Sequence, residues 1–163
     1  MMARWFVVGW LMLGWLAGAI ALLPQSAIAG PVDSYVSRFL DASEPVELPQ
    51  DDSTTQLFSA VDLTVGKRLF EANCKNCHVG GSTLPNPLVP LSLTALQGAT
   101  PPRDTISSLV AFLREPMTYD GSEAALECRR VSADWMDQPQ VEKLSAFILR
   151  SAQKAPGWGS SDF

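Results

Sequence analysis

Two cysteines and a histidine stand close together near the middle of the chain. Cys74 and Cys77 are separated by two residues, and His78, the sole histidine among 163 residues, follows directly. This spacing is the attachment signature of c-type haem, in which two thiols bind the vinyl groups and the histidine ligates the iron. We therefore predict one covalently attached haem c per chain, with thioether links at Cys74 and Cys77 and with His78 as the proximal axial ligand.

Other uses of these residues agree less well with the sequence. A thioredoxin-like redox pair also uses Cys-x-x-Cys, but in a βαβ context of which the sequence shows no sign. A zinc site could be built from three cysteines and the histidine, although adjacent Cys77 and His78 rarely both reach one small tetrahedral ion. A structural disulfide would leave one of the 3 cysteines unpaired. Haem attachment is the favoured interpretation.

The distal ligand of the iron determines the redox behaviour of such a protein. The chain holds 1 histidine, so the distal position falls to another residue, to water or to nothing. The candidates are Cys128, Met136 and Met117; methionine raises the potential of a haem, whereas a thiolate favours ferric iron and lowers it. Arg129 and Arg130 follow Cys128 directly, and we expect their charges to lower the pKa of its thiol. Met136 is the rival ligand, and Met117 is expected to serve packing.

The single histidine also disfavours a haem enzyme of the peroxidase class. Such an enzyme needs a distal acid–base group, most often a histidine, and the sequence offers no second one. We therefore expect that the protein is not an enzyme and that it has no catalytic residues.

The N-terminus reads as an export signal. Arg4 precedes an apolar run over residues 5–23, and Ala27 and Ala29 frame a small-x-small cleavage site. We predict that residues 1–29 are a cleaved Sec-type signal peptide and that the mature chain begins at Gly30. The alternative is an uncleaved membrane anchor, because the run approaches the roughly 20 residues that a spanning helix needs.

The charge balance excludes one class of partner. The chain carries 17 acidic and 12 basic side chains, a formal net charge of −5. Removal of residues 1–29 takes away Arg4 and no acidic residue, which changes the net charge from −5 to −6. No basic surface for phosphate backbones is indicated, so we expect no nucleic-acid partner and consider a basic redox partner instead.

The mature chain is expected to divide at Asp62. Residues 30–61 are acidic and contain 3 prolines among them, so we expect them to contribute little to the core. A small hairpin is predicted there, because residues 46–48 and 54–58 flank the turn-like residues 50–53. Residues 62–163 are predicted to be the cytochrome c haem domain.

The first predicted helix leads directly into the haem motif. It begins with Asp62 as its N-cap and continues through residue 72, just before Cys74. Gly66 lies in its interior, where glycine costs about 1 kcal/mol relative to alanine, and therefore predicts a close crossing with another helix. The alternative is a tolerated surface glycine.

Two further helices follow a proline-rich loop. Residues 85–90 contain 3 prolines and are predicted to form a loop at the haem edge. One helix opens at residues 101–104 and stops at Pro116, and the last helix begins at Pro139. Their apolar stripes are Ile106, Leu109, Val110, Leu113, Val141, Leu144, Phe147 and Ile148. The predicted fold is mainly α, a monohaem class I-like cytochrome c fold with a small N-terminal β-hairpin.

The order of short sequence blocks along the chain resembles one family. The blocks are residues 66–70 (GKRLF), 77–81 (CHVGG), 86–87 (NP), 99–104 (ATPPRD), 118–121 (TYDG), 132–134 (SAD) and 158–159 (WG). In this order they are similar to the cytochrome c-550 family of cyanobacterial photosystem II, and most similar to its divergent cytochrome c-550-like branch. The resemblance covers nearly all of the mature chain, and the ATPPRD and TYDG blocks are specific to it.

The resemblance implies a low-potential c-type cytochrome in the cyanobacterial thylakoid lumen. Such a protein is peripheral to the membrane, docks on the lumenal face of photosystem II, and serves electron transfer or structural support of the oxygen-evolving complex, where the family helps to retain chloride and calcium. In this family a second histidine lies between the TYDG and SAD blocks, and here Cys128 stands in that segment. The resemblance therefore implies that Cys128 is the distal ligand, with Met136 as the alternative.

Two other functions remain open at this point. The protein could be a free soluble lumenal electron carrier, whose acidic charge directs it to basic surfaces in a salt-dependent way. It could also be a haem redox or ligand sensor in which a labile iron–Cys128 bond opens on reduction.

Overall fold

The computed structural model describes residues 31–84 and 89–160. The predicted signal peptide over residues 1–29 lies outside the described residues, as do residues 85–88 of the predicted proline-rich loop. No helix in the described part of the chain is long and apolar enough to cross a membrane.

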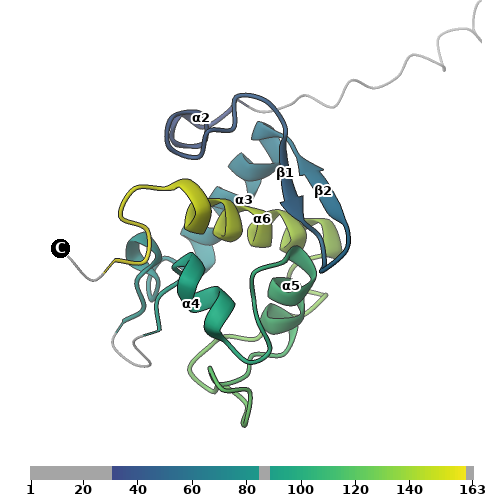
Figure 1. Ribbon diagram of the computed structural model, residues 1–163, viewed down its shortest axis with the longest axis vertical. Helices are drawn as coiled ribbons and strands as arrows, with labels where there is room; N and C mark the ends of the chain where they lie inside the picture. Colours follow the sequence, from purple (N-terminus) through teal and green to yellow (C-terminus); the bar gives the residue numbers. More distant parts are fainter. Residues whose placement is uncertain (1–30, 85–88, 161–163) are drawn as a thin grey trace, which may run out of the picture.

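The described chain is mainly helical, as predicted, with one two-stranded sheet (Figure 1). In chain order its elements are α2 (Ser34–Phe39), β1 (Val46–Pro49), β2 (Thr55–Phe58), α3 (Ala60–Asn73), the 3₁₀-helix η2 (Val79–Gly81), α4 (Leu93–Gly98), α5 (Ile106–Arg114) and α6 (Gln138–Lys154). In Figure 1, α6 runs through the middle of the molecule, with the hairpin beside it and α4 and α5 on one side.

The centre of the fold is the crossing of α3 and α6. Gly66 of α3 is buried there, and a Cβ at this position would overlap the carbonyl oxygen of Lys143 and lie 2.8 Å from Cβ of Phe147. The close crossing predicted from Gly66 is therefore confirmed. The apolar stripes of α5 and α6 are buried as predicted, and α5 packs against α6.

The predicted hairpin is present. Strands β1 and β2 pair antiparallel from Val46 opposite Phe58 to Pro49 opposite Thr55. In the turn, the Asp51 carboxylate accepts hydrogen bonds from the backbone N–H groups of Ser53 and Thr54. These bonds favour the charged carboxylate and lower the pKa of Asp51 to about 2.

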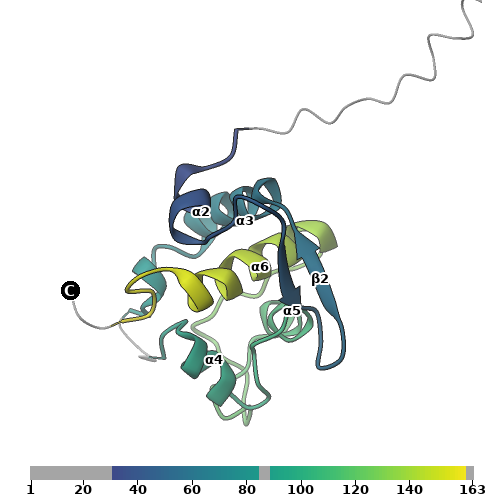
Figure 2. The ribbon, with the colours of Figure 1, turned by 45° about the horizontal axis from the view of Figure 1, so that its top comes forward.

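The expectation that residues 30–61 contribute little to the core is wrong. Residues 34–39 form a helix, and this segment places six side chains in the core: Val36, Leu40, Ala42, Val46, Leu48 and Phe58. Figure 2 shows α2 lying over α3. The acidic residues obscured the pattern because they occupy the exposed positions between these buried ones.

The predicted helix starts need correction by a few residues. Ser59, not Asp62, is the N-cap of α3; Asp62 is its third residue, and the two side chains exchange hydrogen bonds with each other's backbone in a capping box. The α5 helix begins after Thr105 rather than at residues 101–104, because Arg103 donates its backbone N–H to Leu96 of α4 instead. Asp137 caps α6, one residue before the helix begins at Gln138.

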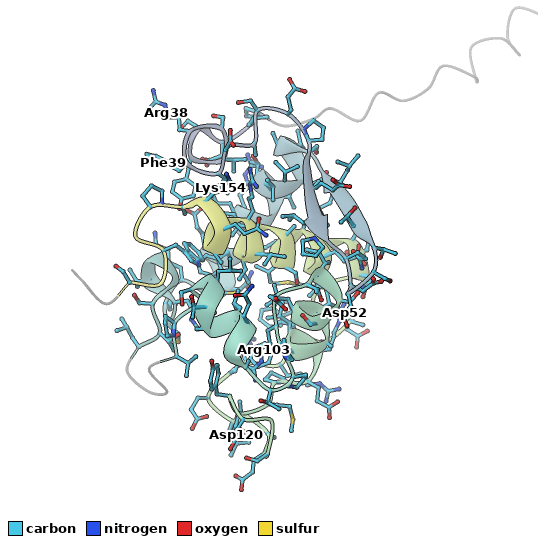
Figure 3. The ribbon with its side chains drawn as sticks, viewed as in Figure 1. Arg38, Phe39, Asp52, Arg103, Asp120 and Lys154 are labelled. Atoms are coloured by element: carbon cyan, nitrogen blue, oxygen red, sulfur yellow. The ribbon has the colours of Figure 1, made fainter. Side chains whose placement is uncertain are left out.

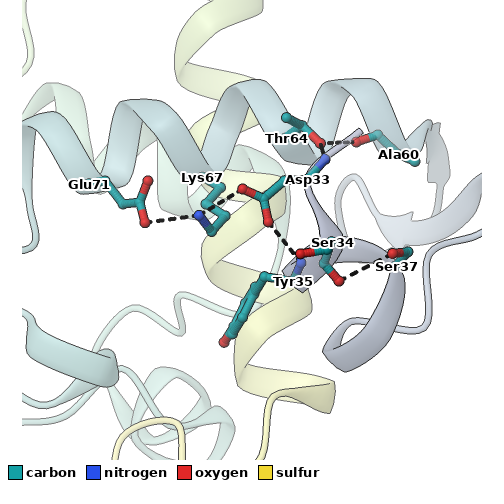
Figure 4. A network of polar contacts seen from close by, with 8 residues as sticks. All are labelled: Asp33, Ser34, Tyr35, Ser37, Ala60, Thr64, Lys67 and Glu71. Atoms are coloured by element: carbon teal, nitrogen blue, oxygen red, sulfur yellow. Dashed lines mark hydrogen bonds and ion pairs between the residues drawn. The ribbon is translucent and has the colours of Figure 1, made fainter. Parts of the chain in front are cut away.

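A polar network ties the N-terminal segment to α3 (Figure 4). The Asp33 carboxylate caps α2 by accepting the N–H of Tyr35 at 2.8 Å, and it pairs with Nζ of Lys67 at 2.9 Å. The backbone N–H of Asp33 donates to the Thr64 hydroxyl at 3.0 Å. Glu71 also pairs with Lys67 at 2.9 Å, so one lysine is shared by two carboxylates.

This network predicts a pH-dependent contribution to stability. The hydrogen bond from Lys67 lowers the pKa of Asp33, so the stabilisation is present above the unfolded-state pKa of about 3.9 and is lost as the pH falls through the folded-state value. We expect Asp33→Asn, which keeps the cap, to cost about 1 kcal/mol or less at pH 7. Urea unfolding measured across pH should show the stability difference between the wild type and Asp33→Asn vanish under acid. A difference that stays constant with pH would contradict the assignment. Glu71→Gln is the control, because it removes the more exposed of the two ion pairs of Lys67.

Candidate haem-binding site

The Cys-x-x-Cys-His motif forms a helical turn that continues from α3. The backbone N–H of Cys74 donates to Phe70 at 2.8 Å, and the N–H groups of Cys77 and His78 donate to the carbonyl of Cys74 at 3.1 and 2.9 Å. A helical turn brings residues three and four apart to one face. Local backbone bonding thus places both thiols and the imidazole at the end of α3.

All three motif side chains line one cavity of about 420 Å³. This volume lies in the range of roughly 300–1,000 Å³ typical of small-molecule and cofactor sites. Much of the wall is made by core side chains, namely Phe70, Leu96, Leu109, Leu113, Val131, Met136 and Ile148. Polar groups also line it, among them Arg103, Thr118 and Glu127. The cavity therefore combines an apolar interior with a small number of polar side chains.

His78 is half-buried, and one of its two ring nitrogens has a hydrogen-bond partner. Nδ1 lies 3.1 Å from the hydroxyl oxygen of Thr83. Burial lowers the pKa of His78, opposed by the backbone of Ser82, so the neutral imidazole that can ligate a metal is favoured.

The alternatives to haem attachment gain no support from this arrangement. All three cysteines are free thiols, so the structure contains no disulfide between them. In residues 31–84 and 89–160, no three or more histidine, cysteine or acidic side chains are grouped to hold a metal ion. Burial raises the pKa of Cys74 to about 11, and the nearby Cys128 and Cys77 add to the rise.

Cys128 reaches the same cavity from a long loop after α5. The loop folds back on itself: Met117 and Ala124 form a bridge, and Ala125 donates its N–H to Pro116 at 2.9 Å. Cys128 follows, half-buried, with its N–H donated to Ala125 at 3.2 Å. The structure thereby brings together residues far apart in the sequence, because Cys128 and the haem motif line one cavity.

The charge that acts on the pKa of Cys128 is not the one expected from the sequence. Arg129 stacks over the Trp135 ring at 4.0 Å, and Nε of Arg130 donates to the carbonyl of Arg114 at 3.0 Å. Burial raises the pKa of the Cys128 thiol, and the positive charge that opposes this rise is that of Arg103. The prediction that the two following arginines lower this pKa is therefore wrong.

Arg103 is the functional residue that sequence reasoning missed. Its guanidinium donates to the carbonyls of Met117 and Thr118 at 3.1 and 2.6 Å and lies over the Phe112 ring at 4.0 Å. Figure 3 labels the half-buried Arg103 and, at the lower end of the molecule, Asp120. Arg103 thus fixes the start of the loop that carries Cys128, and its place in the ATPPRD block was the only signal for it.

The two methionines also line the cavity, in different settings. Met136 is 2% exposed and belongs to the hydrophobic core, and its carbonyl accepts a hydrogen bond from Arg114 at 2.9 Å. Met117 is half-buried where the loop leaves α5. Met136 is engaged in core packing, whereas Cys128 is not part of the core cluster.

The hydrogen bonds of Arg103 predict a stability effect that a matched arginine does not share. We expect Arg103→Ala to lower the free energy of unfolding of the haem-loaded protein by about 2–3 kcal/mol, because two loop carbonyls lose a charged donor. Arg129→Ala removes a similar stacking contact at 4.0 Å and should cost about 1 kcal/mol or less. Equal losses in urea unfolding would contradict the role given to the Arg103 hydrogen bonds.

Haem c fits this set of residues. The thiols of Cys74 and Cys77, the imidazole of His78 and a further sulfur at Cys128 all face one cavity with apolar walls. Two thiols and an adjacent histidine are the donor set for covalent attachment and proximal ligation of haem c.

Comparison with known proteins gives a consistent result. The family model described as cytochrome c-550 domain matches residues 38–163. A cytochrome c-550-like protein of Thermosynechococcus vestitus is 59% identical over 160 residues, covering 93% of this chain and 91% of that protein. Photosystem II extrinsic protein V of Gloeobacter violaceus is 50% identical over 147 residues, covering 90% of this chain and 79% of that protein.

Solved structures agree with the fold. The crystal structure of the PsbV2 cytochrome from Thermosynechococcus elongatus matches with a TM-score of 0.78 and 66% identity, over 79% of this chain and 99% of that one. Cytochrome c549 matches with a TM-score of 0.60 and 32% identity, over 66% of this chain and 90% of that one. The predicted fold, mainly α and class I-like with a small hairpin, is confirmed.

Proposed function

The chain belongs to the cytochrome c-550 family, and from that premise we propose that it is a low-potential, lumenal haem protein of photosystem II with a Cys128 distal ligand. In this proposal residues 1–29 are removed on export, and residues 62–163 form the haem domain. Its role is electron transfer or structural support at the lumenal face of the photosystem, not enzymatic catalysis.

Covalently bound haem c is the cofactor of this family, and when bound it supplies a one-electron iron couple. Cys74 and Cys77 fix the cofactor through thioether links, and His78 ligates the iron from the proximal side. Core side chains such as Leu109 and Leu113 line the cavity and exclude water from it.

The observation that carries the proposal is that Cys128 lines the same cavity as the haem motif. A thiolate donates negative charge to the iron, which favours the ferric state and lowers the potential. Burial raises the pKa of the Cys128 thiol, and the Arg103 charge opposes that rise and so favours the thiolate form. Met136 is the alternative distal ligand, but its side chain is 2% exposed and packed in the core.

The photosystem partner is supported by the relatives. Two proteins named photosystem II extrinsic protein V, from Gloeobacter violaceus and from a Synechococcus strain, are 50% and 39% identical to this chain. The net charge of −6 that follows removal of residues 1–29 favours binding to basic surfaces that weakens with salt.

A binding experiment tests this proposal. The haem-loaded protein would be mixed with cyanobacterial photosystem II stripped of its extrinsic proteins, and bound haem absorbance would be measured after washes of rising salt. We expect retention at low salt and release at about 1 M salt, where screening acts within a few ångströms. Release of the protein already in the low-salt wash would favour a free electron carrier. Binding of carbon monoxide to the reduced protein would favour a sensor with a labile iron–Cys128 bond.

A further inference from the structure

The hydrogen bonds of Thr83 determine which nitrogen of His78 carries the proton. The Thr83 hydroxyl oxygen lies 2.5 Å from the carbonyl oxygen of Val89 and 3.1 Å from Nδ1 of His78. A hydroxyl has one hydrogen and a carbonyl can only accept, so Thr83 donates to Val89. Its oxygen can then only accept from His78, which places the imidazole proton on Nδ1 and leaves the lone pair on Nε2.

We propose that Thr83 is a positioning residue that directs Nε2 of His78 toward the haem iron and lowers the midpoint potential by accepting a hydrogen bond from the Nδ1–H group. This inference rests on the proposed function, in which His78 is the proximal ligand. A partner that accepts from the ring N–H of a metal-bound histidine fixes its tautomer and orientation and raises its basicity. A more basic ligand stabilises ferric iron, so loss of the Thr83 hydroxyl raises the potential.

Thr83 is held in place by the backbone on both sides. The N–H of Ser82 donates to Val79 at 3.0 Å, and the N–H of Leu84 donates to Cys77 at 2.9 Å. Because the Thr83 hydroxyl donates to Val89 while it accepts from His78, each bond polarises the other, and both are strengthened. The half-buried position of Thr83 limits competition from water.

The test is a redox titration of haem-loaded variants. Thr83→Val and Thr83→Ala both remove the hydroxyl, and each is expected to shift the iron reduction equilibrium roughly tenfold toward the ferrous form, about 59 mV for one electron. Thr83→Ser keeps the hydroxyl and should retain the wild-type potential. The matched control is Ser82→Ala, in the same turn as Thr83. It removes the hydrogen bond from the Ser82 hydroxyl to the carbonyl of Ser160 at 2.7 Å and should leave the potential unchanged.

The outcomes separate this inference from the proposed function. Loss of the low-spin spectrum in His78→Ala, with covalent haem retained, supports His78 as the ligand; an unchanged spectrum would overturn the proposed function itself. If His78→Ala behaves as expected but both hydroxyl-free variants keep the wild-type potential, the Ser82 backbone satisfies the ring N–H and the role of Thr83 is refuted. An equal shift in Ser82→Ala would also refute it, because the effect would then come from the turn.

Discussion

Replacing Gly66 with alanine should lower the free energy of unfolding by about 2 kcal/mol, although alanine is the better helix former. The added Cβ overlaps the carbonyl oxygen of Lys143 and lies 2.8 Å from Cβ of Phe147. The first of these atoms belongs to the backbone of α6 and cannot rotate away, so the two helices must separate. A clash with rigid backbone places the overpacking cost at the upper end of the usual range, about 3 kcal/mol, and alanine returns about 1 kcal/mol through helix propensity.

Urea unfolding of the haem-loaded protein measures this effect. Arg68→Ala is a suitable control, because Arg68 lies on the exposed face of the same helix and surface substitutions usually stay within about 0.5 kcal/mol. A Gly66→Ala protein as stable as the wild type would show that α3 and α6 do not cross as closely as described. Since this helix ends in the haem motif, we also expect altered haem absorption in Gly66→Ala.

The second large effect is on the redox potential. Cys128→Met should raise the midpoint potential by more than about 100 mV, because a neutral thioether replaces a negatively charged thiolate that stabilises ferric iron. Spectroelectrochemical titration checks this shift. Met136→Leu conserves volume in the core and should leave the potential near that of the wild type, at a stability cost of less than about 1.5 kcal/mol.

The reverse pattern would contradict the ligand assignment. If Met136→Leu moved the potential strongly while Cys128→Met left it unchanged, Met136 would be the distal ligand and a higher-potential soluble carrier would be the better interpretation. Covalent haem should be retained in both variants, because Cys74 and Cys77 are untouched.

The sequence was most informative where function depends on local spacing. Cys74, Cys77 and His78 lie within a single helical turn, so their identity and order alone predict the cofactor. The stripes of α5 and α6 were equally clear, because helical periodicity is a local property. Gly66 predicted a close crossing, since glycine inside a helix is unfavourable and a close approach of another backbone explains it, with a tolerated surface glycine as the alternative.

One error was local, and the others came where distant contacts decide the structure. Ser59 and Asp62 are both good caps, and their reciprocal hydrogen bonds chose the earlier start. The short helices α2 and α4 have 6 residues each and too few turns for a periodic signal, so tertiary packing must stabilise them. Arg103 lines the same cavity as Cys128 because α4 and the loop after α5 both bond to it, whereas Arg129, adjacent to Cys128 in the sequence, stacks on Trp135.

Low-temperature EPR of the oxidised haem-loaded protein tests the central claim most directly, when the wild type is compared with Cys128→Ala and Met136→Ala. Axial thiolate and axial thioether give distinct low-spin ferric signals. We predict a thiolate-type signal in the wild type that is lost in Cys128→Ala and retained in Met136→Ala. A signal that survives in Cys128→Ala and collapses in Met136→Ala would contradict His78 and Cys128 as the axial pair.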